Sequence, residues 1–268
     1  MRLTMALLIA LSTALAAAET KVPAGAQALG YTRCLFDEKP TAEQIAPEGK
    51  GDYAWFSGQW YAKPPALDLY STVDGALTLK LGGDLCSAPR DFAKSKLPLL
   101  AGADGFYVEF DVKLSSDYPD HWPAVWLMPA EHNGKQEDHY EPDPPGFERF
   151  MEFDIDEGGF GPGLTGTVHS SEGIWKDGYK HVQNPNNVSK TPLDRSQKHT
   201  FGGSYDPKAG KVTWWVDGVE QMSATAPYVP AIAAKQHFYM ILSCQTHGKN
   251  VPYTMTVSGV RAYAPSAK

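Results

Sequence analysis

The segment MEFDIDE, residues 151–157, decides how the sequence is interpreted. Its apolar and acidic residues alternate, and a period of two is typical of a β-strand. The two faces are Met151, Phe153 and Ile155 against Glu152, Asp154 and Asp156. Acids that crowd one face repel one another and raise one another's pKa values, so a strand that only meets solvent rarely carries three. The segment therefore predicts a strand with an apolar core face and an acidic functional face.

Glu157 is out of phase with Glu152. In a regular strand its side chain would enter the core, where an unpaired charge is costly. A β-bulge near residues 155–156 would return Glu157 to the face of Glu152. Even then the two Cα atoms lie well over 10 Å apart, at about 3.4 Å per residue. We therefore expect a concave sheet on which both long side chains lean over Asp154, and a concave sheet is a groove that suits a polymer.

Short strands separated by turn residues extend from about residue 53 onward. Residues 67–73 and 76–81 alternate on either side of Asp74-Gly75, which predicts a hairpin. Further strands are expected at 106–114, 124–128, 150–156, 163–170, 199–205, 212–216, 237–244 and 253–262. This spacing predicts an all-β fold, an antiparallel sandwich or barrel. The loop 130–147 is long and rich in charge and proline, which is typical of a functional loop.

Length, composition and charge limit the number of domains and the kinds of partner that the protein can have. The chain has 268 residues, 42% of them hydrophobic, which suits one large β domain or two smaller α/β domains. Its formal net charge is −7, and no cluster of Lys and Arg occurs. A nucleic-acid surface needs a basic stripe, so we expect no nucleic-acid partner.

The first residues have the pattern of a secretory signal. Arg2 precedes an apolar run over residues 5–15, and small residues follow up to Ala18. A membrane anchor is the alternative, but a span needs about 20 apolar residues. We expect cleavage after Ala18, a single domain over residues 19–268, and a secreted or periplasmic protein that does not contact the membrane after cleavage.

The chain has three cysteines, enough for one disulfide and too few for a disulfide scaffold or a cysteine-only zinc site. Alternation in the strand 237–244 places Cys244 in the core as a buried thiol. A disulfide would then join Cys34 and Cys86.

Two motifs carry a resemblance to a known family. Residues 152–157, EFDIDE, match Glu-x-Asp-x-x-Glu, and residues 122–127, WPAVWL, match Trp-Pro-Ala-x-Trp-Leu. In this order, about 30 residues apart, they resemble family 16 of the glycoside hydrolases, the laminarinase and lichenase-like enzymes. The similarity covers roughly residues 105–263, and the part before it is similar only in strand pattern. The resemblance implies a jelly-roll sandwich of two antiparallel sheets with a concave substrate groove.

The resemblance also implies a mechanism. Glu152 would be the nucleophile, Glu157 the acid/base and Asp154 the assisting carboxylate of a retaining endo-β-glycosidase that cleaves a β-glucan or related polysaccharide. Glu157 should have a raised pKa, and Glu152 should stay ionised. The family usually has an apolar residue at position 156. Asp156 could therefore replace Glu157 as the acid if the strand were unbulged.

Four further positions are candidates for substrate binding on the groove face. Alternation places Trp122 and Trp126 there, with the small Ala124 between them, where indole rings could stack on sugars. An ordinary core role is the alternative for this pair. His169 matches a groove histidine of the family, although a lone strand histidine is often structural. Gln245 lies on the predicted groove floor as a hydroxyl partner.

Trp175 is a fifth candidate, on a glycine-rich loop where it could line the rim or only cover the sandwich edge. No metal ligands are assigned, because the His and acid spacing in the loop 130–147 fits no standard pattern. No cofactor is required, although the resemblance allows a structural calcium with unidentified ligands. A calcium site or a solvated edge remains the alternative for the acidic strand.

We expect a monomer that acts on a neutral polysaccharide. Three alternatives stay open at this point. A transglycosylase would use the same carboxylates. A non-catalytic glycan-binding module would keep the tryptophans and need neither Glu152 nor Glu157. A polysaccharide lyase would need a base and cations for an acidic sugar, and the predicted groove is acidic.

Overall fold

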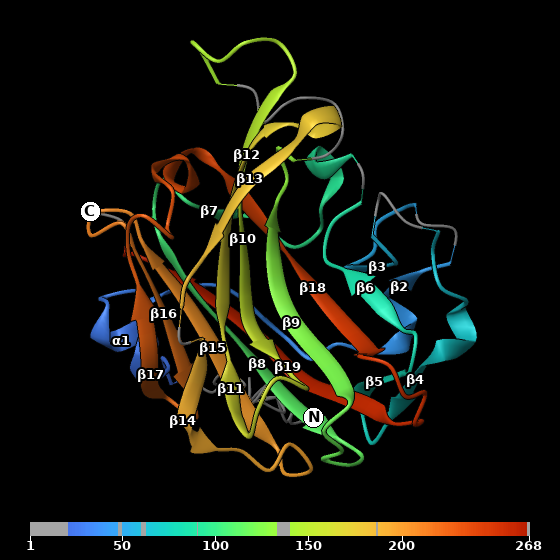
Figure 1. Cartoon of the computed structure of the whole chain (residues 1–268). Helices are drawn as coiled ribbons and strands as arrows, with labels where there is room; N and C mark the ends of the chain where they lie inside the picture. Colours follow the sequence, from blue (N-terminus) through green and yellow to red (C-terminus); the bar gives the residue numbers. More distant parts are fainter. Residues whose placement is uncertain are drawn as a thin grey trace, which may run out of the picture.

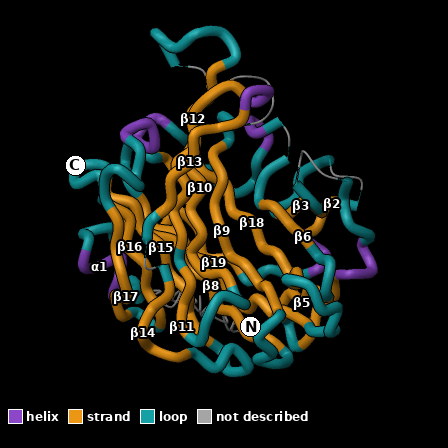
Figure 2. Tube along the Cα trace, viewed as in Figure 1, coloured by secondary structure: helices purple, strands orange, loops and turns teal. Residues whose placement is uncertain are grey.

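The computed structural model describes residues 21–47, 50–59, 63–89, 91–132, 140–185 and 187–266. Two large β-sheets pack face to face in it (Figures 1 and 2). The expected signal segment, residues 1–18, and its cleavage site lie outside the described residues. No described helix is long and apolar enough to cross a membrane.

The first sheet, here called the carboxylate sheet, contains the acidic strand. Its strand order is β13 (Gly178–Gln183), β12 (Thr167–Ile174), β10 (Phe147–Glu157), β9 (His121–Pro129), β18 (His237–Thr246), β6 (Asp84–Cys86), β3 (Trp55–Ser57) and β2 (Ile45–Ala46), with β7 (Leu100–Ala101) beside β18. Neighbouring strands are antiparallel except β2 and β3, which are parallel.

The second sheet, here called the covering sheet, packs against the apolar face of the first. Its order is β17 (Val219–Ala224), β16 (Lys211–Val216), β15 (His199–Asp206), β8 (Phe106–Leu114), β19 (Thr254–Ala264), β5 (Ala76–Lys80) and β4 (Tyr70–Val73), with β1 (Arg33–Glu38) beside β19. A small third sheet pairs β11 (Gly163–Thr165) with β14 (Val188–Pro192). The expected all-β sandwich of two sheets is confirmed.

Short helical segments connect the strands. They are the helix α1 (Ala24–Ala28) and the 3₁₀ turns η1 (Ala42–Gln44), η2 (Leu67–Leu69), η3 (Phe92–Lys94), η4 (Trp175–Asp177) and η5 (Ala231–Lys235). The expected strand over residues 67–73 is therefore wrong in its first three residues, which form η2. The expected strand over 163–170 is divided between β11 and β12.

The hairpin turn between β4 and β5 is confirmed. Asp74 and Gly75 both have positive φ, 50° and 74°. Two positive φ angles are what a type I′ turn requires, and this turn matches the twist of the paired strands.

The acidic strand contributes its apolar face to the core between the sheets. Met151, Phe153 and Ile155 are each 0% exposed and belong to the main core cluster. Gly203 of β15 allows the sheets to approach, because a Cβ there would lie 2.6 Å from Cγ1 of Ile155. The predicted phase of residues 151–155 is confirmed, and the opposite face is left for the acids.

The cysteines do not form the expected disulfide. All three thiols are free: Cys34 is exposed on β1 of the covering sheet, and Cys86 is buried on β6 of the carboxylate sheet. The two residues lie in different sheets, Cys34 on β1 beside β19 and Cys86 on β6 beside β18, and no bond joins their sulfur atoms in the structure. The Cys34–Cys86 pairing is therefore wrong. Cys244 is buried, as expected.

Candidate active site

A β-bulge in β10 turns Glu157 toward the acidic face. In the register with β9, Asp154 pairs with Trp126 and Asp156 pairs with Val125, so Ile155 has no partner of its own. Glu157 consequently pairs with Ala124 and shares its face. The predicted bulge is confirmed, and it places Glu152, Asp154 and Glu157 on one face of the sheet.

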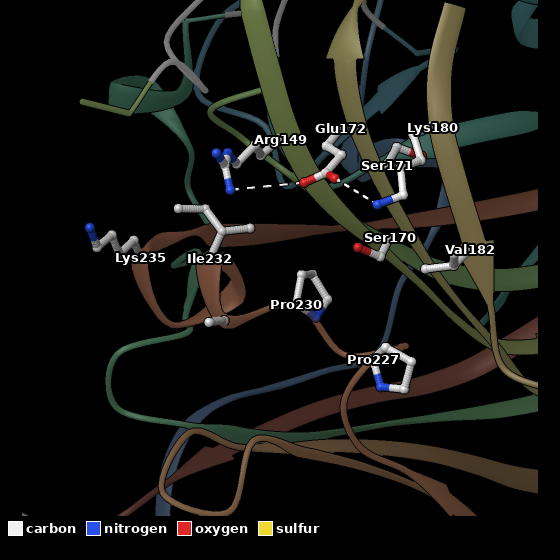
Figure 3. A pocket seen from close by; sticks show the side chains of 11 residues that line it. Arg149, Ser170, Ser171, Glu172, Lys180, Val182, Pro227, Pro230, Ile232 and Lys235 are labelled. Atoms are coloured by element: carbon white, nitrogen blue, oxygen red, sulfur yellow. Dashed lines mark hydrogen bonds and ion pairs between the residues drawn. The ribbon is translucent and has the colours of Figure 1, made fainter. Parts of the chain in front are cut away.

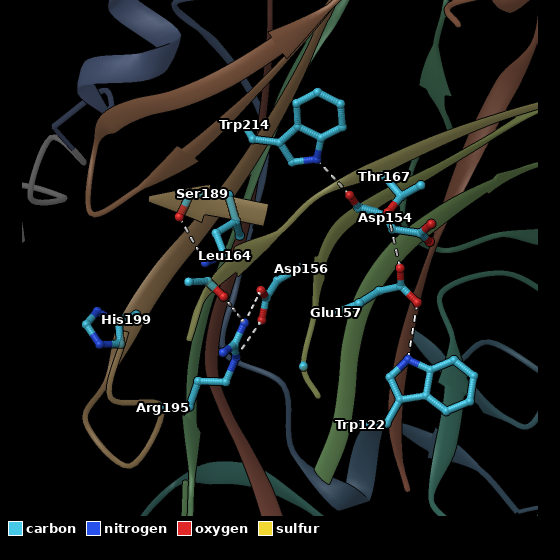
Figure 4. Close-up of polar contacts among 12 residues, drawn as sticks. Trp122, Asp154, Asp156, Glu157, Leu164, Thr167, Ser189, Arg195, His199 and Trp214 are labelled. Atoms are coloured by element: carbon cyan, nitrogen blue, oxygen red, sulfur yellow. Dashed lines mark hydrogen bonds and ion pairs between the residues drawn. The ribbon is translucent and has the colours of Figure 1, made fainter. Parts of the chain in front are cut away.

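Asp156 points the other way, to the face of Val125. Arg195, in the loop after β14, donates to both of its carboxylate oxygens, from Nη2 to Oδ1 at 2.7 Å and from Nε to Oδ2 at 3.2 Å (Figure 4). Both side chains are buried, and Arg195 also donates to the Gly163 carbonyl at 3.1 Å. The unbulged strand that an acid role for Asp156 requires does not form, so that alternative is wrong.

Glu157 accepts hydrogen bonds on both oxygens. Trp122 Nε1 donates to Oε1 at 3.1 Å, and Thr167 Oγ1 lies 3.4 Å from Oε2 (Figure 4). Asn187 holds Thr167 in turn, by a 3.0 Å bond from its Nδ2 to Oγ1. Burial raises the pKa of Glu157 above its ordinary value, against the lowering effect of the Trp122 bond. This direction agrees with the expected acid/base.

Asp154 is buried on the same face as Glu152 and Glu157 and contacts a histidine. His169 Nε2 lies 3.1 Å from Asp154 Oδ2, and β12 places His169 directly opposite Glu152. His169 Nδ1 lies 2.7 Å from Nε2 of His181 on β13. Burial, and then the charge of Glu157, raise the pKa of Asp154. A chain Asp154–His169–His181 therefore leads from the buried carboxyl to an exposed imidazole.

Glu152 differs from expectation in its ionisation. Burial, with the charge of Asp154 as the next cause, raises its pKa to about 8, and only His169 acts in the opposite direction. The expectation that Glu152 stays ionised while Glu157 alone is shifted is wrong for the free protein. Three carboxyl groups share one poorly solvated face, so each disfavours the charge of the next.

The same cluster contains the one metal-like grouping in the described part of the chain. One ligand atom each from Glu152, Asp154 and His169 lie within 4.8 Å of one another. A set of two carboxylates and an imidazole suits zinc better than calcium, which prefers oxygen ligands. This set is therefore a poor match to a structural calcium, which stays an expectation without assigned ligands. Part of the loop 130–147, residues 133–139, lies outside the described residues.

Trp122 and Trp126 lie half-buried on the acidic face, as predicted. One face of the Trp122 indole is already covered, because His247 stacks on it at 4.4 Å between ring centroids. Phe160, 52% exposed, meets both rings edge-on. Trp122 is therefore more a support for Glu157 than an open stacking platform. Trp126 Nε1 instead donates to Ser243 Oγ at 3.0 Å.

The two remaining binding candidates differ in position. Gln245 pairs with Trp122 across β18 and β9, so it lies on the acidic face where it was expected. Trp175 is 74% exposed on η4 and packs against Tyr179, with 5.7 Å between ring centroids. It lies six residues beyond His169, about 20 Å along an extended strand. The structure does not bring Trp175 to the carboxylates.

Several residues of the site have no clear sequence signal. His247, Phe160 and His181 reach it from separate loops and strands, and Arg195 binds Asp156 from behind it. The pair Gly158-Gly159 is the one available hint, because a Cβ at Gly159 would lie 2.3 Å from Cδ2 of His247.

A cavity of about 420 Å³ lies elsewhere, between β12, β13 and η5 (Figure 3). Its lining includes Ser170 and Glu172, which alternate with His169 along β12 and so face away from the carboxylates. Glu172 pairs there with Lys180 at 3.2 Å and with Arg149 at 3.9 Å. This cavity is not part of the candidate active site.

Comparison with known proteins extends the fold assignment. No family model matches the chain, and no curated protein matches its sequence. Among solved structures, a β-porphyranase from the human gut bacterium Bacteroides plebeius has a TM-score of 0.55 and 16% identity, over 85% of this chain and 92% of that one.

Two other enzymes are similar to the same extent. A laminarinase from Flavobacterium sp. UMI-01 has a TM-score of 0.52 and 15% identity, over 86% of this chain and 100% of that one. A structure from work on endo-acting O-glycanases of the human gut microbiota has a TM-score of 0.52 and 18% identity, over 87% and 99%. The chain therefore has the β-sandwich fold of these three solved structures, which is the fold that its resemblance to family 16 of the glycoside hydrolases implies.

Proposed function

We propose that the protein is a secreted or periplasmic, retaining endo-β-glycosidase of family 16 that cleaves a neutral polysaccharide of the β-glucan or a related type. The observation that carries the proposal is the bulge that brings Glu157 to the face of Glu152 and Asp154. A binding module would need neither glutamate and no such bulge. The similar enzymes differ in substrate, so the fold itself does not select one.

The chemistry needs one ionised and one protonated carboxyl. Glu157, whose pKa is raised by burial, would donate its proton to the leaving glycosidic oxygen. An ionised Glu152 would attack the anomeric carbon and form a glycosyl-enzyme ester. Glu157 would then deprotonate the water that cleaves this ester with retained configuration. An acceptor sugar in place of water would give transglycosylation.

Asp154 and His169 would control the charge on Glu152. Because the pKa of Glu152 is about 8 in the free protein, its proton must pass to solvent water before the carboxylate can attack. A proton on His169 favours this ionisation, and His169 Nε2 lies 3.1 Å from Asp154. No cofactor enters these steps. Removal of residues 1–18 and a monomeric state belong to the same proposal.

The reaction is tested with the expressed full chain on a panel of soluble polysaccharides. The panel contains laminarin, mixed-linkage β-glucan, a galactan, porphyran and κ-carrageenan, and reducing ends and product anomers are measured. We expect short oligosaccharides from a neutral member, with the β-anomer formed first. No cleavage of any member, or first formation of the α-anomer, contradicts the proposal.

Variants assign the two glutamates. Glu152→Gln should abolish hydrolysis and keep glycan binding. Glu157→Ala should lose turnover, because no base activates the water that cleaves the ester. Azide needs no base, so adding azide should restore turnover of an activated aryl glycoside by this variant. Asp68→Asn, on the exposed turn η2, is the matched control and should behave as the parent. Undiminished turnover in Glu152→Gln would exclude Glu152 as nucleophile.

A further inference from the structure

A row of side chains crosses the carboxylate sheet from Glu157. The registers pair Glu157 with Ala124, Ala124 with Ser243, and Ser243 with Asp84, across β10, β9, β18 and β6. Paired residues of antiparallel strands share a face, so Asp84 lies on the face of the catalytic carboxylates. Three strand spacings of about 4.8 Å separate Asp84 from Glu157, about 14 Å in all.

Small side chains occupy the middle of this row, and an aromatic ring lies next to them. Ala124 and Ser243 are small, and Trp126 stands beside them with its indole Nε1 bonded to Ser243 Oγ at 3.0 Å. The same Ser243 hydroxyl donates to Asp84 Oδ1 at 2.8 Å. These bonds orient the half-buried Trp126 ring on the sheet surface between Glu157 and Asp84.

The far end of the row is rich in acceptors. Gln59 Nε2 donates to Asp84 Oδ2 at 3.0 Å, and Gln59 Oε1 is buried without a hydrogen-bond partner. Gln59 itself is only 7% exposed. Among the residues that the structure describes, no Lys or Arg forms an ion pair with Asp84. Within the described ranges, this end therefore presents the negative charge of Asp84 and no Lys or Arg paired with it that could hold an anion.

We propose that Asp84, with Ser243, Gln59 and Trp126, forms a glycan-binding position that accepts an uncharged, hydroxyl-bearing sugar and rejects a sulfated or carboxylated one. Sugar hydroxyls can donate to the lone pairs that Asp84 has left, and the ring can pack against Trp126. A sulfate group has only acceptors and would face a carboxylate with no cation between them. The inference rests on the proposed function and names the residues that would make its substrate a neutral one.

The ionisation of Asp84 supports this selectivity. Burial raises the pKa of Asp84 to about 6, so the carboxylate form prevails at neutral pH. Asp84→Asn removes the charge at nearly constant volume. The new amide can be accommodated by a 180° turn of the Gln59 side-chain amide, which replaces the donor Nε2 with the acceptor Oε1, an atom that has no partner in the structure. We therefore expect this variant to fold.

The test measures binding of three named probes: laminarin, porphyran and chemically desulfated porphyran. Binding is measured by affinity electrophoresis in the Glu152→Gln background, so that nothing is cleaved. The parent should bind the neutral probes and bind porphyran more weakly than its desulfated form. Asp84→Asn should weaken neutral binding by about tenfold and reduce the preference for the desulfated form. Asp68→Asn is the control and should bind as the parent.

The outcomes separate this inference from the proposed function. Equal affinities in Asp84→Asn and its parent, or a parent that prefers native porphyran, overturn the role of Asp84 even if a polysaccharide is cleaved. If no polysaccharide is cleaved or bound, the proposed function fails, and the inference fails with it.

Discussion

Arg195 donates two hydrogen bonds to Asp156, on the side of β10 opposite to Glu157. The ion pair lies at the bulge, and it keeps the Asp156 carboxylate on the side of β10 opposite to the acidic face. A buried carboxylate without such a partner would be costly. The pair also explains how the chain tolerates an acid at position 156, where the resemblance leads one to expect an apolar residue.

Breaking this pair should damage both stability and turnover. We expect Arg195→Met to lower the free energy of unfolding by about 3 to 5 kcal/mol, because Asp156 is left buried and unpaired. We expect kcat to fall by about a hundredfold if the bulge shifts Glu157 by as little as 1 Å. Urea unfolding and steady-state kinetics measure the two effects.

The double variant Asp156→Leu/Arg195→Met is the control. It removes both charges and should recover most of the stability. A single variant as stable as the parent would show that the pair does not hold the bulge.

Trp122→Phe should change the pH dependence of catalysis. The indole bond favours the charged form of Glu157, so its loss raises the pKa of that carboxyl further. Because the acid must be protonated, the alkaline limb of kcat/KM should move to higher pH. Phenylalanine keeps a ring against His247. Trp126→Phe, which loses a bond to Ser243 instead, should leave the limb in place, and a limb that moves down in Trp122→Phe contradicts the prediction.

Glu152→Gln should stabilise the protein at alkaline pH. The pKa of Glu152 is raised to about 8 in the folded state, so between its ordinary value and 8 the folded state binds more protons than the unfolded state. Wild-type stability from this group is complete at low pH and is lost as pH rises through 8. Glutamine does not titrate.

The two proteins should therefore have similar stability at pH 4.5, and the variant should gain roughly 5 kcal/mol by pH 9 if the full pKa shift is realised. Urea unfolding at these two pH values measures the gain. A gain at pH 4.5 that vanishes at pH 9 would show that the pKa of Glu152 is lowered.

The thiols should differ in reactivity. Burial and the charge of Asp37 raise the pKa of Cys34, but its thiol is exposed, whereas Cys86 and Cys244 are buried and burial raises the pKa of each to about 12. We expect iodoacetamide to label Cys34 alone in the native protein and all three cysteines in urea without reductant. Mass spectrometry of the peptides distinguishes the sites. A thiol that stays unlabelled in urea would indicate a disulfide.

Much of the acidic strand could be predicted from its own residues. The phase of Met151, Phe153 and Ile155 follows from a period of two, and the bulge follows from the cost of burying Glu157. Both arguments concern neighbours along the chain. The family resemblance of residues 122–127 and 152–157 predicted the two-sheet sandwich and placed a tryptophan-bearing strand beside the acidic strand.

Other features depend on residues far apart in the sequence, and no local pattern marks them. Arg195 meets Asp156 across 39 positions, and Ser243 meets Asp84 across 159. The pKa of Glu152 likewise depends on how deeply the assembled sheet buries three acids at once. The sequence by itself therefore determined the strand, its faces and its kink, because these are set by side-chain alternation and charge burial. Only the tertiary structure decided that Asp156 pairs with Arg195, that His247 covers the Trp122 indole and that the row from Glu157 ends at Asp84. These contacts depend on how strands and loops that are distant in the chain are placed against one another.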